Sequence, residues 1–180
     1  MVNKALFLDR DGVINSDAGY THIWSPSIVM ENIVDVVKSF KKKNYLIVVI
    51  TNQSGIGRAY YSEEEFKIFM KHLFEFFDKK NACLDDYYYC SCDPMQSVCM
   101  NRKPNPGMFF SASEKHNINL SKSVMIGDKL SDMIAADRAL IKSKFLYASL
   151  NKRNDFSDNE VDFTLVHSLS EVSASKIKES

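Results

Sequence analysis

An apolar run that ends abruptly on acidic residues constrains this sequence more than any other feature. Residues 5–8 have the pattern of a buried strand, and Asp9-Arg10-Asp11-Gly12 follows them directly. Open α/β sheets bind ligands at the carboxyl ends of their strands, so these carboxylates stand where chemistry takes place. They can offer a side chain and a backbone carbonyl to one hard cation, while Gly12 permits a sharp turn. Taken alone, the motif is equally typical of an acidic turn after a strand.

Strand and helix patterns alternate along the rest of the chain. Residues 33–40 have apolar side chains at helical spacing, residues 45–50 form a β-branched run, and Ser62 opens a helix with a capping-box signature. Further strands are predicted at 86–89, 124–126, 144–147 and 163–166, helices at 108–116, 131–139 and 169–177, and a loop at 151–160. The alternation predicts an α/β fold with a Rossmann-like, doubly wound, mostly parallel sheet and helices on both faces. The length of 180 residues favours a single domain over residues 1–180.

Polar clusters follow several of these strands and would meet at one edge of the sheet. Residues 51–54 follow the second strand, Lys103 stands in a rigid turn, and Asp128 follows the fourth strand. Each fragment alone is more typical of a turn, a surface loop or a helix start. Together with Asp9 and Asp11 they supply a nucleophile, a proton-transfer group, oxyanion donors, a cation and a third acidic metal ligand. That combination favours phosphoryl transfer, in which positioning and charge neutralisation dominate.

Composition narrows the remaining function classes. The formal net charge is zero, which argues against a nucleic-acid partner, and no apolar window approaches the length of a membrane span. The chain enters its first strand without a basic and apolar leader, so we expect no secretory signal and a cytoplasmic location. Three of the four cysteines fall within residues 90–99, a spacing more typical of a metal site or reduced thiols than of a disulfide framework. We expect a monomer that acts on a small-molecule sugar phosphate, without a nucleic-acid or membrane partner.

Four motifs together resemble those of the haloacid dehalogenase superfamily of phosphatases. They are Asp9-Arg10-Asp11-Gly12, Thr51, Lys103 with Pro104, and Gly127-Asp128-Lys129-Leu130-Ser131-Asp132. With their neighbours, they are similar to the branch that contains the heptose bisphosphate phosphatases and the related histidinol-phosphate phosphatases. The resemblance runs from Leu6 to about Ala136 and is weak after Leu150.

The resemblance implies roles in a Mg²⁺-dependent reaction. Asp9 would be the nucleophile that carries an aspartyl-phosphate, and Asp11 the general acid and base. Asp9, the Asp11 backbone carbonyl and Asp128 would bind Mg²⁺, with Asp132 orienting neighbours at the metal. The phosphoryl group would be held by Thr51 and Lys103, and the rest of a sugar phosphate by Arg102, Lys129, Asp17, Ala18, Gly19, Tyr20, Asn52, Gln53 and Ser54.

The cysteine loop departs from this family pattern. Relatives hold a structural zinc with Cys-x-His and Cys-x-Cys just before Arg-Lys-Pro, whereas this chain has Cys90-Ser91-Cys92 and Cys99-Met100-Asn101. Asn101 stands where a fourth thiolate is expected, and amides are poor ligands for a closed zinc site. Zn²⁺ bound by Cys90, Cys92 and Cys99, with Asp93 or Cys83 completing the set, and a metal-free loop of the same shape both remain open.

The resemblance also bounds the reaction. The loops at residues 16–26 and 90–99 are too short for the cap domain of many relatives, so we expect no separate cap. The expected reaction is removal of the 7-phosphate from D-glycero-D-manno-heptose 1,7-bisphosphate, with histidinol phosphate as the alternative substrate. A polynucleotide 3′-phosphatase would favour a more basic surface. A non-catalytic phosphate-binding module would favour loss of an essential group, yet Asp9, Asp11, Lys103 and Asp128 are all present.

Overall fold

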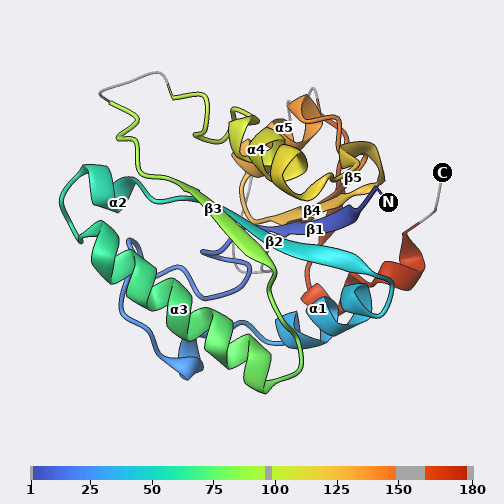
Figure 1. Cartoon of the computed structure of the whole chain (residues 1–180), viewed down its shortest axis with the longest axis horizontal. Coiled ribbons are helices and arrows are strands. Elements are labelled where there is room, and N and C mark those ends of the chain that lie inside the picture. Colours follow the sequence, from blue (N-terminus) through green and yellow to red (C-terminus); the bar gives the residue numbers. More distant parts are fainter. Residues whose placement is uncertain (1, 96–98, 149–160, 178–180) are drawn as a thin grey trace.

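A six-stranded sheet, with every neighbouring pair of strands parallel, forms the middle layer of the computed structural model, which describes residues 2–95, 99–148 and 161–177 (Figure 1). The strand order is β3-β2-β1-β4-β5-β6. The strands are β1 (Lys4–Leu8), β2 (Tyr45–Asn52), β3 (Asp86–Cys90), β4 (Val124–Gly127), β5 (Ser143–Tyr147) and β6 (Thr164–Val166). β1 is central, because Leu8 pairs with Val49 on one side and with Ile126 on the other. The predicted fold class is confirmed.

Helices cover both faces of this sheet (Figure 1). α1 (Ile33–Lys41) and α3 (Glu63–Lys79) lie on one face, and α4 (Gly107–His116) and α5 (Leu130–Arg138) lie on the other. Along β1, Leu6 and Leu8 belong to the first core, whereas Ala5 and Phe7 belong to the second. A parallel strand buried on both sides reads as a continuous apolar run, which is why residues 5–8 show no polar alternation.

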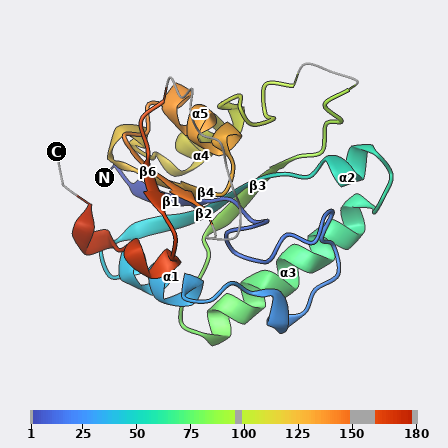
Figure 2. The same ribbon diagram turned by 180° about the vertical axis from the view of Figure 1, so that it is seen from behind.

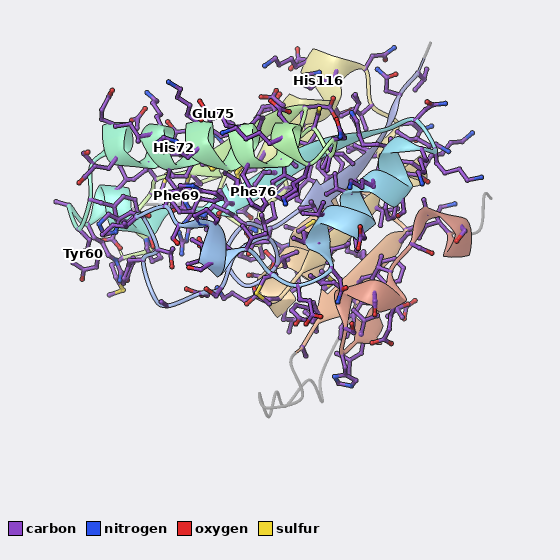
Figure 3. The ribbon with its side chains drawn as sticks, turned by 90° about the horizontal axis from the view of Figure 1, so that it is seen from below. Tyr60, Phe69, His72, Glu75, Phe76 and His116 are labelled. Carbon is purple, nitrogen blue, oxygen red and sulfur yellow. The ribbon has the colours of Figure 1, made fainter. Side chains whose placement is uncertain are left out.

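Helix α3 begins with the predicted capping box and packs on one face of the sheet. Its predicted capping box is present: the Ser62 hydroxyl accepts from the Glu65 amide at 3.1 Å, and the Glu65 carboxylate accepts from the Ser62 amide at 2.7 Å. Phe69 and Phe76 point inward, and Glu75 points away (Figure 3). The two rings hold Trp24, whose ring centroid lies 5.5 and 5.8 Å from theirs. The loop that precedes α1 is thereby fastened to α3.

The predicted C-terminal helix at residues 169–177 is wrong. Two short 3₁₀ turns, Leu169–Glu171 and Ala174–Lys176, replace it and lie beside α1 (Figure 2). Serine side chains explain the difference, because they satisfy nearby backbone groups outside a helix. The Ser168 hydroxyl accepts from the Ser170 amide at 3.3 Å, and the turn carries its own capping box with Glu171. The loop predicted at residues 151–160 lies outside the described residues.

The described connections contain little further regular secondary structure. The fully described segment between β1 and α1 contains one 3₁₀ turn, Pro26–Ile28, and no further helix or strand, in agreement with the expected lack of a cap. A one-turn helix, α2 (Ser54–Gly57), which the sequence did not indicate, follows β2 directly, and a 3₁₀ turn, Leu120–Lys122, precedes β4. None of the helices within residues 2–95, 99–148 and 161–177 is long and apolar enough to cross a membrane.

Candidate active site

A cavity of about 540 Å³ opens at the carboxyl ends of the central strands. This volume lies in the range of small-molecule sites, and the position is where open α/β sheets bind ligands. Its walls are Asp9, Asp11, Asp17, Gly19, Tyr20, Thr51, Asn52, Gln53, Ser54, Tyr61, Arg102, Lys103, Pro104, Lys129, Ser131 and Asp132. The structure therefore brings together most of the predicted site residues from five separate segments of the chain.

A buried lysine joins two aspartates at the floor of this cavity. The Lys103 ammonium lies 2.9 Å from Asp9 Oδ1 and 2.6 Å from Asp132 Oδ1, and it donates to the Ile50 carbonyl at 2.8 Å. All three residues are at most 5% exposed. A buried ion pair is stable only when its remaining hydrogen bonds are made, and here each ammonium proton has an acceptor.

Charge and burial act in opposite directions on this pair. Burial raises the pKa of Asp9, and the Lys103 ammonium opposes that rise. Burial alone would lower the pKa of Lys103, but the carboxylates of Asp132 and Asp9 outweigh it and raise the pKa above its ordinary value. Lys103 thus remains a fixed cation beside Asp9, suited to neutralising an oxyanion.

Three carboxylates, Asp9, Asp128 and Asp132, form what we call the acidic cluster. One oxygen of each lies within 4.8 Å of the others, and all three side chains are buried. A Cβ on Gly12, whose φ is +88°, would collide with the Asp128 carboxylate, so glycine lets Asp128 approach the turn after β1. Asp132 contacts the Lys103 ammonium and accepts from the Lys129 amide at 3.0 Å. Clustered carboxylate oxygens fit a hard divalent cation such as Mg²⁺.

Asp11 lies in a network of donors on the other side of the turn. Asn15 Nδ2 donates to its Oδ1 at 2.9 Å and Gln53 Nε2 to its Oδ2 at 2.9 Å. Arg10 donates to both oxygens through Nη2, at 2.8 and 2.7 Å. The carboxylate lines the cavity while these three side chains fix its orientation.

The residues at the end of β2 form hydrogen bonds with the residues at the floor of the cavity, not with those at its rim. Gln53 Nε2 also donates to Thr51 Oγ1 at 2.8 Å, and Tyr61 donates to Gln53 Oε1 at 2.5 Å. The Asn52 amide forms reciprocal bonds of 3.0 Å with the backbone N–H and C=O of Lys103. The side chains of Asn52 and Gln53, expected to contact substrate, are thus engaged within the protein, although both line the cavity.

The rim carries the cations and the predicted substrate loop. Lys129 Nζ lies 3.3 Å from Asp17 Oδ2 and 3.9 Å from Asp128 Oδ1; burial would lower its pKa, but these acids and Asp9 raise it. Arg102 lines the cavity and donates to the Cys92 carbonyl at 3.2 Å. Gly19 and Tyr20 line it as well, whereas Ala18, between them and Asp17, is absent from its walls.

Four residues of this site were given no role by the sequence reasoning. Tyr61, Pro104 and Ser131 line the cavity, and Arg10 is fully buried against Asp11. Arg10 and Ser131 stand inside recognised motifs, so their positions were a usable signal. Tyr61 lies between α2 and α3 without any motif, and nothing in the sequence distinguished it from other aromatic residues.

Cys90, Cys92 and Cys99 form a second group, the thiol cluster, at the end of β3. Their sulfur atoms lie within 4.8 Å of one another, and Cys90 Sγ is 3.3 Å from Cys99 Sγ. The group has three members among the described residues. Asn101 is exposed, with its amide oxygen against Gly107. The thiols therefore do not supply the four protein ligands of a closed structural zinc site.

The two proposed substitutes are placed elsewhere. Asp93 accepts from Arg58 Nε at 3.2 Å and from the Met95 amide at 3.1 Å. Cys83 is exposed and precedes β3, whereas Cys90 ends it, so the five-residue strand separates the two thiols. Neither residue belongs to the thiol cluster.

Comparisons with known proteins agree with this fold. The family model described as polynucleotide kinase 3 phosphatase matches residues 10–171. The D-glycero-β-D-manno-heptose-1,7-bisphosphate 7-phosphatase of Escherichia coli K12 is 36% identical over 167 residues, covering 89% of this chain and 87% of the relative. The enzyme of the same name from Haemophilus ducreyi is 41% identical over 152 residues, covering 81% and 84%.

A solved structure has the same fold. D,D-heptose 1,7-bisphosphate phosphatase from B. bronchiseptica, complexed with magnesium and phosphate, superposes with a TM-score of 0.79 at 24% identity, covering 91% of this chain and 92% of that one. The parallel sheet with its Asp-x-Asp turn, buried lysine and second acidic turn defines the class of the haloacid dehalogenase-like phosphatases. Within that class, the chain belongs to the polynucleotide kinase 3 phosphatase family, together with these bacterial phosphatases. The resemblance stated from the motifs is confirmed.

Proposed function

We propose that this protein hydrolyses D-glycero-β-D-manno-heptose 1,7-bisphosphate to heptose 1-phosphate and phosphate, in the synthesis of nucleotide-activated heptose. The observation that carries the proposal is the arrangement of charges around one cavity. Asp9 and Lys103 lie 2.9 Å apart at its floor, and the cations Arg102 and Lys129 stand at its rim. A substrate with a phosphate at each end fits this pair of positive regions. The relatives at 36–41% identity carry this activity in their names.

The proposed first step transfers the phosphoryl group to the enzyme. A carboxylate oxygen of Asp9 forms a bond to the 7-phosphorus while the bond from phosphorus to the sugar oxygen breaks. Asp11 gives its proton to the departing sugar oxygen. Lys103 and the Thr51 hydroxyl hold the phosphoryl oxygens, whose charge must be neutralised during transfer.

The proposed second step regenerates Asp9. Asp11 takes a proton from water, the water oxygen bonds to phosphorus, and the bond from phosphorus to Asp9 breaks, which releases phosphate. The Asp9 and Asp128 carboxylates and the Asp11 backbone carbonyl would hold Mg²⁺, which would supply additional charge neutralisation. Asp132 positions Lys103 and the Lys129 amide through the contacts already described.

Substrate choice is assigned to the rim. The side chains of Arg102 and Lys103 point in different directions. The Arg102 guanidinium contacts the Cys92 carbonyl, whereas the Lys103 ammonium lies at the cavity floor. A planar guanidinium suits the distal phosphate or sugar hydroxyls. Histidinol phosphate has a cationic distal end and would gain little from Arg102.

A substrate comparison tests this proposal. We expect wild-type kcat/KM to be higher for heptose 1,7-bisphosphate than for histidinol phosphate, heptose monophosphates or a 3′-phosphorylated oligonucleotide. Arg102→Ala should narrow the preference by about tenfold, mainly through KM. Arg138→Ala is the matched control, because Arg138 donates to the Pro104 carbonyl on the same turn at 3.1 Å yet does not line the cavity. A wild type that prefers histidinol phosphate would replace the heptose assignment with that alternative.

A further inference from the structure

Arg10 is the largest side chain that the described residues bury completely. Its guanidinium carbon lies 4.5 Å from the ring centroid of Phe69 and 5.6 Å from that of Phe66. Phe69 points inward from α3 (Figure 3). Burying a charge costs free energy unless the charge is paired. The partners of this guanidinium therefore indicate the role of Arg10.

Those contacts converge on the neighbouring carboxylate. Arg10 Nε and Nη2 donate to Asp11 Oδ1 at 3.1 and 2.8 Å, and Nη2 donates to Asp11 Oδ2 at 2.7 Å. The guanidinium is a rigid planar donor, so contact with both oxygens fixes the plane of the carboxylate as well as its position. The two rings beneath the guanidinium in turn prevent Arg10 from moving aside.

The same side chain also reaches the predicted substrate loop. Arg10 Nη2 donates to the Thr21 carbonyl at 2.6 Å. Thr21 follows Gly19 and Tyr20, which line the cavity, whereas Arg10 itself is absent from the cavity walls. Arg10 therefore cannot contact a substrate directly. It does contact Asp11 and the loop around Thr21, both of which belong to the proposed substrate site.

A purely structural buried cation looks different in this chain. Lys144 is 5% exposed and lies 2.8 Å from Asp137 Oδ1, with a further bond of 3.1 Å to the Ile141 carbonyl. Neither Lys144 nor Asp137 lines the cavity. Arg10 differs because its partner is the residue assigned to proton transfer.

We propose that Arg10 is a positioning residue, which holds Asp11 in the orientation for proton transfer and links that orientation to the loop around Thr21. The inference rests on the proposed function, because it takes Asp11 as the acid and base. The proposal predicts that loss of the guanidinium slows the reaction steps in which Asp11 transfers a proton. Steps without proton transfer by Asp11 should keep their rates.

The leaving group of the substrate separates these cases. p-Nitrophenolate departs without protonation, whereas the alkoxide of an alkyl phosphate requires a proton from Asp11. Arg10→Lys keeps the charge but loses the planar fork, and Arg10→Met loses both. For both variants, kcat/KM for an alkyl phosphate should fall by about 100-fold, since general acid catalysis contributes roughly 10²–10⁴-fold. For p-nitrophenyl phosphate it should fall less than about threefold.

Pre-steady-state kinetics give a second readout. With slowed hydrolysis of the phosphoenzyme, each variant should release one equivalent of p-nitrophenolate in a burst before a slower steady rate. Asp11→Asn should show the same pattern, and Arg10→Lys combined with Asp11→Asn should be no slower than Asp11→Asn alone. Far-UV circular dichroism checks folding, and Arg10→Lys keeps the test available if Arg10→Met does not fold.

Lys144→Met is the matched control, because it removes a buried cation remote from the cavity. It should lower thermal stability without a burst or any dependence on the leaving group. Equal losses on both classes of substrate in Arg10→Lys, without a burst, would overturn the proposal and leave Arg10 a structural cation. The assay uses simple phosphate esters, so it is independent of whether heptose bisphosphate is the preferred substrate. A wild type that hydrolyses no phosphate ester would overturn both proposals.

Discussion

The acidic cluster and the thiol cluster are two groups of three potential metal ligands, and they are built differently. Each group brings one atom per residue within 4.8 Å of the others. The acidic cluster comes from the ends of the adjacent central strands β1 and β4 and the start of α5, and all its members are buried. The thiol cluster comes from the end of the edge strand β3 and the loop after it, and two of its members are partly exposed.

The surroundings of the two groups differ as well. Lys103 and Lys129 balance the acidic cluster with positive charge. In the thiol cluster, burial raises the pKa of Cys90 to about 12, whereas hydrogen bonds, that of Cys92 first, lower the pKa of Cys99. Ligands on paired strands are fixed by the sheet register. Ligands on one loop depend on every residue of that loop, so a single asparagine at position 101 leaves the thiol cluster with three members.

The sharpest test of the acidic side is Asp9→Asn. An amide cannot form the phosphoenzyme, so we expect turnover to fall by roughly 10³-fold or more with the fold intact. Phosphate release measures the loss, and circular dichroism measures the fold. Retention of more than a few per cent of the wild-type rate would refute the covalent mechanism.

Metal removal separates the two clusters. Treatment with EDTA should lower activity by about 100-fold or more, and Mg²⁺ alone should restore it, since Mg²⁺ prefers oxygen ligands to thiolates. Asp128→Ala should resemble the EDTA-treated enzyme and should not recover with Mg²⁺. Full activity after exhaustive chelation would contradict the proposed site at the acidic cluster.

The zinc content of the thiol cluster should rise when a fourth thiolate is added. Elemental analysis of the purified wild type should find less than one zinc per chain, and Asn101→Cys should raise this to about one, because four thiolates close a structural site. Cys83→Ser is the control, since Cys83 lies at the other end of β3, and it should leave the zinc content unchanged. A full equivalent of zinc with four sulfur ligands in the wild type would show that Asn101 does not keep the site open.

The smallest effect concerns Tyr61, which supports the acidic side through Gln53. Burial raises the pKa of Tyr61 from its ordinary value of 10 to about 12. The folded chain keeps this proton at a pH where the unfolded chain loses it, so its stabilising effect is complete below pH 10 and is lost as pH rises towards 12. Tyr61→Phe should therefore reduce the alkaline fall in the free energy of unfolding, by at most about 2.7 kcal/mol for a rise in pKa from 10 to about 12. Urea titrations at several pH values measure it.

Tyr60→Phe is the control for this titration. Tyr60 is adjacent to Tyr61 but exposed, and its ring meets that of Tyr20 at 4.6 Å. Its substitution removes a neighbouring phenol hydroxyl and leaves the bond from Tyr61 to Gln53 in place. Equal slopes for Tyr61→Phe and the wild type would show that Tyr61 ionises as readily in the folded chain as in the unfolded one.

Strand-end positions explain why much of the fold and site could be predicted. Asp9, Thr51 and Asp128 each follow or end an apolar strand, and the carboxyl ends of parallel strands necessarily meet. Lys103 follows no strand; it was grouped with these residues as the cation that phosphoryl transfer requires, and the family resemblance supplied its role. The Asn52 side chain illustrates the limit, because its bonds to the Lys103 backbone join residues that only the tertiary fold brings together.

Local chemistry explains the error near the C-terminus. Apolar spacing in residues 169–177 favoured a helix, but alternating serines offered the backbone competing partners. Arg10 shows the same limit within the site. Its motif position was clear from the sequence, while its stacking on Phe69 and its bond to Thr21 depend on the placement of α3 and the loop before α1.

The central place of β1 has a consequence for the synthesis of the chain. β1 can pair with β2 soon after both leave the ribosome, but its other edge waits for β4, which is made well over a hundred residues later. At ~5–20 residues per second, that edge stays unpaired for on the order of ten seconds. Residues 5–8 are wholly apolar, and an open apolar edge is a template for pairing with other chains. Throughout this interval, pairing of the strand that precedes the nucleophile with another chain competes with its pairing with β4.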